Sequence, residues 1–176
     1  MVSLTRRLMA DRRGVSAVEF ALVAPLLIAF YFGVAELTQA MMAMRKVSHV
    51  ASTLGDLTAQ SDRLNNAQVA DIFEASRLIL APLPANALQA RISSLTANDQ
   101  GVVRVDWSDG RNMAALAANA QHTLPAGVVA PGQSTIMAEV TYNYDSPLGY
   151  FLPGGQTFSR TYHLRPRRVA KVERVS

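Results

Sequence analysis

The sequence predicts an α+β protein with a long N-terminal membrane-spanning helix, a second helix and a small antiparallel sheet of about four strands. Hydrophobic residues make up 49% of the 176 residues, and they are concentrated in one block near the N-terminus. After that block the apolar residues recur at helical spacing as far as residue 80, and beyond residue 90 they alternate with polar ones. This change of period along the chain favours helices packed against an antiparallel sheet.

The apolar block runs from Val15 to Val34, and Glu19 is its one charged residue. Its twenty residues would form a helix of about 30 Å, the thickness of a bilayer hydrocarbon core. Four arginines precede the block, and the next cations are Arg45 and Lys46. This bias holds the N-terminus in the cytoplasm and sends the C-terminal part across the membrane. A cleaved secretory signal and a buried core helix are the alternatives, but the block is longer than the first and more evenly apolar than the second.

Glu19 requires an explanation, because an ionisable side chain inside a spanning segment costs roughly 2.5–3.5 kcal/mol. One interpretation places it near the cytoplasmic interface, where water solvates it. The other begins with a cut after Gly14, which would give Val15 a free amino group on the helical face of Glu19. That amine could neutralise the carboxylate in its own chain or in a neighbour and set the register between helices. Pro25 lacks a backbone donor and is expected to kink the helix.

The helix is expected to continue beyond the membrane, because apolar residues still repeat at spacings of three and four. These residues are Ala40, Met44, Val47, Ala51 and Leu54. Glu36, Lys46 and Ser52 fall opposite this stripe, on the side expected to be exposed. Gly55-Asp56 is the expected end of the helix.

A second helix is predicted from about Asn66 to Leu80, with Asn65 or Asn66 as its cap and Pro82 after its end. Its apolar side is expected to include Phe73 and Leu78. Residues 111–120 are rich in alanine and are expected to form a short helix after a turn at 109–110.

Four strands are predicted from the alternating segments. They cover residues 90–95, 103–107, 135–144 and 158–164, and the first two are expected to pair across residues 96–101. Ile136, Ala138, Val140, Tyr142 and Tyr144 should face one way. In the loop Ser146–Gly155, the run Leu148–Leu152 is either tucked into the domain or an exposed contact patch.

The residue types argue against an enzyme. The chain has no cysteine, which excludes a disulfide framework, a thiolate zinc site and a cysteine nucleophile. His49, His122 and His163 lack paired ligand spacing, and no glycine-rich phosphate loop occurs. The carboxylates that could still converge are Asp106, Asp109, Glu139 and Asp145. We therefore predict no catalytic residue, metal, cofactor or small-molecule substrate.

The formal net charge is +4, and the basic residues are concentrated at the two ends of the chain, with a net +3 over residues 1–14 and +5 from residue 160 onward, so the part between them is mildly acidic at −4. Nucleic-acid binding is not favoured, because it needs basic residues along one folded face. The basic tail after residue 160 has two interpretations. It is either a solvated, frayed end or a surface on which Arg165, Arg167 and Arg168 dock an acidic partner or an anionic membrane face.

One motif resembles a known family. Gly14, then four residues, then Glu19-Phe20 and an apolar helix, resembles the prepilin-peptidase site of type IV pilins and pseudopilins. Over residues 12–36 the chain is similar to the TadE-like family, minor pseudopilins of the tight-adherence (Flp) pilus system of bacteria. Arg165-Pro166-Arg167 is a weaker C-terminal similarity to the same family.

The resemblance implies a pilin-like fold and cleavage between Gly14 and Val15 by a prepilin peptidase on the cytoplasmic side. It also implies Glu19 as the family's charged helix residue, and partners among pilin or pseudopilin subunits and the pilus assembly machinery. Major Flp pilins usually carry Glu-Tyr here and are much shorter. Phe20 and the long C-terminal region therefore indicate a minor component, and incorporation into the fibre is left open.

The expected organisation is a cytoplasmic leader over residues 1–14 and a membrane-spanning and extended helix over 15–56. A periplasmic α+β domain follows over 57–165, and a basic tail over 166–176. The predicted function is participation in assembly of a tight-adherence (Flp/type IVb) pilus from the bacterial inner membrane. The alternative is an uncleaved, signal-anchored envelope protein whose periplasmic domain binds a partner or ligand. A membrane-tethered hydrolase ranks last, because the sequence shows no nucleophile or metal cluster.

Overall fold

The structure is a computed structural model that describes residues 14–175. The predicted leader therefore lies outside the described residues, except for Gly14. In chain order the elements are α2 (Val15–Ala59), β1 (Arg63–Leu64), α3 (Asn66–Leu80), the 3-10 turn η2 (Ala85–Ala87), β2 (Leu88–Ala97), β3 (Val103–Arg111), β4 (Ser134–Tyr144), β5 (Gln156–Leu164) and β6 (Glu173–Arg174). The predicted fold class is confirmed: a long apolar N-terminal helix, a second helix and a four-stranded antiparallel sheet packed against the long helix.

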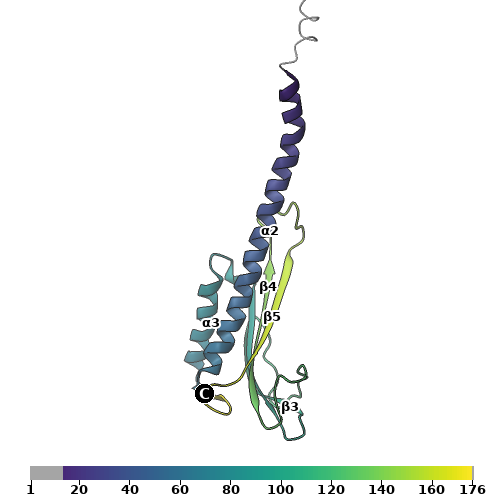
Figure 1. The fold of residues 1–176 in the computed structure, drawn as a ribbon. Helices are drawn as coiled ribbons and strands as arrows, with labels where there is room; N and C mark the ends of the chain where they lie inside the picture. Colours follow the sequence, from purple (N-terminus) through teal and green to yellow (C-terminus); the bar gives the residue numbers. More distant parts are fainter. Residues whose placement is uncertain (1–13, 176) are drawn as a thin grey trace, which may run out of the picture.

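α2 has two halves with different surroundings. Its N-terminal half projects away from the rest of the molecule, and α3 and the sheet gather around its C-terminal half (Figure 1). Within residues 14–175, α2 is the one helix long and apolar enough to cross a membrane, and none of its most apolar stretch is buried. In the C-terminal half the buried apolar residues are Ala40, Ala43, Val47, Val50, Ala51, Leu54 and Ala59. Met44, which the sequence placed on this stripe, is exposed, because the buried face passes through Ala43.

The predicted end of this helix at Gly55-Asp56 is wrong, since α2 continues to Ala59. Gly55 is buried where α2 crosses the sheet. A Cβ atom on Gly55 would overlap the side chain of Leu164 and lie 3.3 Å from the Cβ of Ala138. The glycine is therefore a point of close approach between helix and sheet, a second common use of this residue.

Replacement of Gly55 by valine should lower the free energy of unfolding by about 1–3 kcal/mol, because the added methyls must displace Leu164 or Ala138. Urea unfolding of the detergent-solubilised chain, followed by Trp107 fluorescence, measures this. Gly55→Ala is the matched control, and its stability should fall less than that of Gly55→Val. Its single methyl group requires only the end of the Leu164 side chain to move, and alanine gains about 1 kcal/mol in helix propensity. An unchanged midpoint for Gly55→Val would contradict the close approach.

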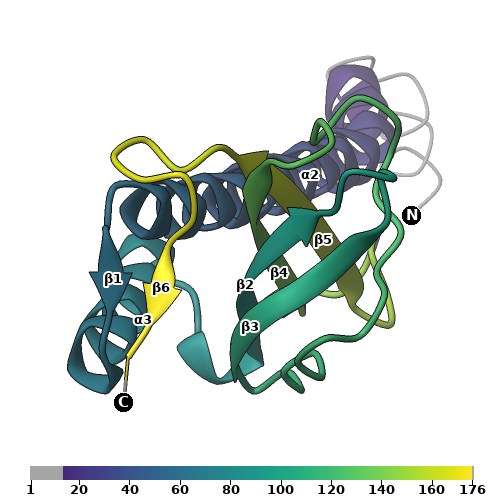
Figure 2. The same cartoon turned by 90° about the horizontal axis from the view of Figure 1, so that it is seen from below.

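The strands follow the order β3-β2-β4-β5, and all neighbours are antiparallel. The predicted pairing of the first two strands is present, but its connection is residues 98–102 and not 96–101, because Ala97 lies opposite Val103 within the sheet. α2 and α3 cover one face of the sheet (Figures 1 and 2). The five alternating residues of β4, from Ile136 to Tyr144, all point into this main core as predicted. A smaller apolar cluster on the other face contains Met137, Leu95 and Val105.

Two predictions near β3 are wrong. Asp109 and Gly110 lie within β3, opposite Ile92 and Arg91, and do not form a turn. Residues 111–120 form no helix. Instead this segment returns along the outer edge of β3, where Asn119 N donates to Val105 O at 2.8 Å and Val105 N donates to Ala120 O at 3.0 Å. These bonds satisfy a strand edge that would otherwise be unpaired, so the tertiary environment overrides the local helix preference.

α3 has the predicted bounds, and its cap is Asn65. Gln68 N donates to the Asn65 side chain at 2.9 Å, and Asn65 N donates to the Gln68 side chain at 3.0 Å, which is a capping box. Leu78 is exposed, contrary to its predicted place on the apolar side. Lys46 of α2, which was predicted on the exposed side, also has a partner. Its ammonium group donates to Ala81 O at 2.6 Å, and this cation at the C-terminal end of α3 ties the two helices together.

The basic tail is packed on the domain. β6 pairs in parallel with β1, a two-stranded element that the sequence did not predict (Figure 2). Val172 is fully buried, and Trp107 Nε1 donates to its carbonyl at 2.8 Å. Arg174 Nε lies 2.8 Å from Asp109 Oδ2. The tail is therefore not a frayed end, because its apolar and charged groups both have partners within the domain.

Candidate functional site

Three of the four carboxylates that could have converged, Asp106, Asp109 and Glu139, have structural partners. Asp106 accepts from Thr96 Oγ1 at 2.6 Å and lies 3.2 Å from Lys171 Nζ. Glu139 pairs with Arg91 at 2.7 Å, and Asp109 pairs with the tail. Within residues 14–175 there is no group of three or more His, Asp or Glu side chains that could hold a metal ion.

Among the described residues, the three histidines belong to no group that could hold a metal ion. His49 is exposed on α2, whereas His163 is half-buried on β5. Burial lowers the pKa of the His163 imidazole, which the nearby Glu139 carboxylate partly opposes. The His163 Nε2 atom is buried and has no hydrogen-bond partner among the described residues.

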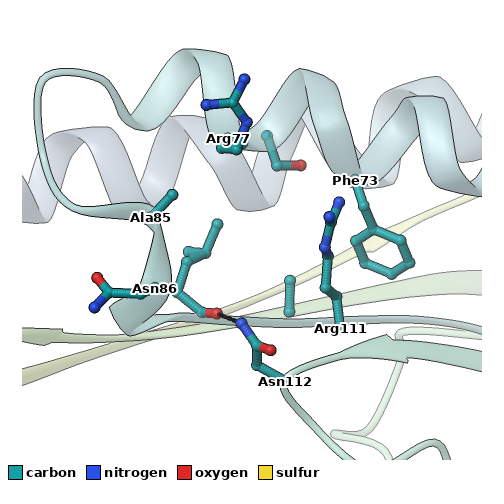
Figure 3. Close-up of a pocket in the computed structure, with 9 residues that line it drawn as sticks. Phe73, Arg77, Ala85, Asn86, Arg111 and Asn112 are labelled. Carbon is teal, nitrogen blue, oxygen red and sulfur yellow. Dashed lines mark hydrogen bonds between the residues drawn. The ribbon is translucent and has the colours of Figure 1, made fainter.

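A hollow of about 290 Å³ lies between α3, η2 and the ends of β2 and β3, and two guanidinium groups border it (Figure 3). Both are already near one carboxylate: Arg77 lies 2.6 Å and Arg111 3.9 Å from Glu74. The Asn112 side chain donates to Leu88 O at 2.9 Å, the dashed line in Figure 3. Because these polar groups are paired within the chain, the hollow is not a strong candidate for anion binding.

The exposed half of α2 is the stronger candidate. Val15 and Glu19 are both exposed and lie one turn apart on α2, and 69% of Phe20 is exposed. Pro25 lies inside a helix that is continuous from Val15, so its predicted kink stays a prediction. An apolar helical surface of this length is not stable in water and needs lipid or other helices to cover it.

A residue whose role the sequence did not reveal lies where the two halves of α2 meet. Glu36 was predicted on the exposed side, but only 1% of it is exposed. Phe151 N donates to Glu36 Oε2 at 2.8 Å, and the Ser146 hydroxyl donates to Oε1. The prediction is wrong because Glu36 lies four residues before Ala40 and so falls on the buried face of α2. Helical spacing could not show its two donors, which lie more than a hundred residues away in the chain. The available signal was a carboxylate two residues beyond the apolar block.

Glu36 holds the β4–β5 loop against α2. The Phe151 ring packs on Gly33, where a Cβ atom would lie 3.6 Å from the ring. Phe151 and Leu152 line an apolar groove of about 540 Å³ together with residues of the exposed half of α2, among them Leu26 and Phe30. Both expectations for the loop are thus partly met: it is fixed to the helix by Glu36, and Tyr150 remains 81% exposed.

Glu36→Gln should release this loop without unfolding the domain. The amide keeps the size of the side chain but loses the negative charge, and a neutral amide oxygen accepts a weaker hydrogen bond from Phe151 N than a carboxylate does. Exchange of the Phe151 amide hydrogen should become roughly tenfold faster, the scale of one lost hydrogen bond. Hydrogen exchange followed by mass spectrometry measures this. Glu74→Gln is the control on an exposed helix, and unchanged exchange in Glu36→Gln would contradict the role of Glu36.

Residues 14–54 match the family model for TadE-like protein. The N-terminal region is thus similar to the TadE-like family. This confirms the resemblance found in the sequence, and the matched segment contains the exposed half of α2, Glu36 and the buried stripe as far as Leu54. No curated protein and no solved structure matches the chain. The match covers the N-terminal part of the chain alone, and the rest of the α+β domain lies outside it.

Proposed function

We propose that this chain is a minor pseudopilin that takes part in assembly of a tight-adherence (Flp/type IVb) pilus. The observation that carries the proposal is the division of α2 within the TadE-like segment. One half is an uncovered apolar helix, and the other half is the centre of a folded α+β domain. A subunit of this shape can be anchored in a membrane by its apolar helix before assembly, and can pack that helix against the helices of neighbouring subunits during assembly.

The proposed location is the bacterial inner membrane, with the N-terminus in the cytoplasm and the α+β domain in the periplasm. The arginines before Val15 support this direction through the positive-inside rule. The proposed partners are the membrane, other pilin or pseudopilin subunits, the assembly machinery and a prepilin peptidase.

The proposed mechanism is association. Lateral packing of N-terminal helix halves would bury their apolar side chains, and the amine created at Val15 would neutralise Glu19 of its own chain or a neighbour. In an apolar surrounding an unpaired carboxylate is costly, so the pair would favour one register between helices.

Processing is the first test. Protein purified from its native membrane should begin at Val15, because the peptidase would cut after Gly14. Intact-mass spectrometry with N-terminal sequencing measures this, and Gly14→Val should leave the leader attached. A wild-type chain that keeps Arg12 and Arg13 would contradict processing and favour the uncleaved, signal-anchored alternative.

That alternative has one structural feature in its favour. A cavity of about 490 Å³ lies between α2, residues 82–87 and the end of β4, and could hold a small ligand. The tail gives partner docking less support. Arg167 and Arg168 already pair with Asp56 and Asp62, which leaves Arg165 as the exposed arginine of the three without an ion pair among the described residues.

A further inference from the structure

We propose that the β4–β5 loop is a second membrane contact: Leu148, Tyr150 and Phe151 enter the lipid interface beside the end of the spanning helix. This inference rests on the part of the proposed function that places α2 in a membrane. It goes beyond that function by assigning a lipid-binding role to the folded domain.

The position of the loop along α2 is the first argument. Phe151 packs on Gly33, and Phe151 and Leu152 share a groove with Leu26 and Phe30. At 1.5 Å per residue, Gly33 lies about 27 Å along the helix from Val15, near the far boundary of a hydrocarbon core about 30 Å thick. A loop fixed at this level cannot avoid the interface once the helix spans the bilayer.

The chemistry of the loop is the second argument. Tyr150 is 81%, Phe151 52% and Leu148 38% exposed, and residues 146–156 contain no charged side chain. Aromatic side chains with one apolar body and one polar end are enriched at the level of the headgroups. An exposed apolar loop that lies beside an apolar helix therefore forms one continuous lipid-compatible surface.

The third argument is that polar donors of the loop have hydrogen-bond partners within the protein. Backbone donors are costly in an apolar medium unless they have partners. Glu36 accepts from Phe151 N at 2.8 Å and from the Ser146 hydroxyl, so the carboxylate fixes the loop and satisfies its donors where water is scarce. Glu36 is thus a positioning residue for the loop.

The two contacts together would set the orientation of the domain. A single helix leaves the domain free to rotate about the helix axis and to change its tilt. The loop adds a second point at the same membrane surface. The groove is lined almost entirely by apolar groups and opens beside residues of the apolar block, so lipid is the occupant that fits it in an isolated subunit.

Quenching of tryptophan fluorescence by brominated lipids tests the proposal in the full chain reconstituted into phosphatidylcholine vesicles. The one native tryptophan, Trp107, bonds to the tail and supplies a constant background. Three single variants are compared. Tyr150→Trp probes the loop, and Tyr31→Trp, on the exposed half of α2, reports insertion of the helix. Tyr162→Trp is the control on the folded domain, since Tyr162 is partly exposed and lies towards the end of β5 that is remote from the loop.

Added quenching of about half or more of the new emission is expected for Tyr150→Trp and Tyr31→Trp, and none for Tyr162→Trp. The result should not depend on the protein-to-lipid ratio, and Glu36→Gln should reduce quenching at position 150 but not at position 31. Quenching at position 31 without quenching at 150 would overturn the loop proposal alone. Quenching at 150 that disappears as protein density rises would also overturn it, because a second copy would then cover the loop. Absence of quenching at position 31 would instead contradict the membrane anchor itself.

Discussion

Leu54→Ala is expected to lower the free energy of unfolding by about 2–5 kcal/mol, the range found when a fully buried leucine is truncated. Leu54 has no exposed surface and belongs to the main core between α2 and the sheet, with Leu80 and Ile92. Neighbours on a helix and a sheet cannot both move to fill the space, so a cavity should remain. Urea unfolding in detergent measures the effect.

Leu78→Ala provides the matched control for this substitution. It removes the same atoms from a helix, but Leu78 is 63% exposed, so its loss should change stability by about 0.5 kcal/mol or less. Equal losses for the two variants would show that α2 and the sheet are not packed as described.

Glu19→Ala is expected to abolish pilus assembly while the protein remains in the membrane. The substitution makes the apolar half of α2 more hydrophobic, so anchoring should be retained. It also removes the proposed partner of the Val15 amine, and with it the feature that fixes the register between helices. Cross-linking of complexes in the membrane and the yield of sheared pili measure the two steps.

Ser16→Ala is the control for this change, because it also places alanine near the start of α2 but leaves the carboxylate in place. Membrane abundance of both variants should equal that of the wild type. Unchanged complex formation and pilus yield in Glu19→Ala would contradict the proposed role of Glu19.

The features that the sequence predicted correctly depend on local periodicity. The length and apolarity of residues 15–34, the capping box around Asn65 and Gln68, and the period-two pattern of β4 are each encoded within a few neighbouring residues. The TadE-like match lies in the same kind of segment. Such signals need no knowledge of distant partners.

The wrong predictions concern residues whose structure depends on distant parts of the chain. Gly55 suggested a helix end, but the approach of Leu164, more than a hundred residues later, makes it an interior position. The alanine-rich segment after β3 suggested a helix, but the free edge of β3 offered stronger hydrogen bonds. In each case a long-range contact outweighed a local preference of about 1 kcal/mol or less per residue.

Glu36 illustrates the difference between what local sequence and what tertiary contacts determine. The sequence by itself determined that a membrane-length helix continues into a folded domain and that a carboxylate lies where the two meet. Only the tertiary structure decided that this carboxylate is buried by the β4–β5 loop, and that the basic tail pairs with β1 instead of fraying. Helical spacing places a side chain on a face of its own helix, whereas burial depends on which distant segment packs against that face.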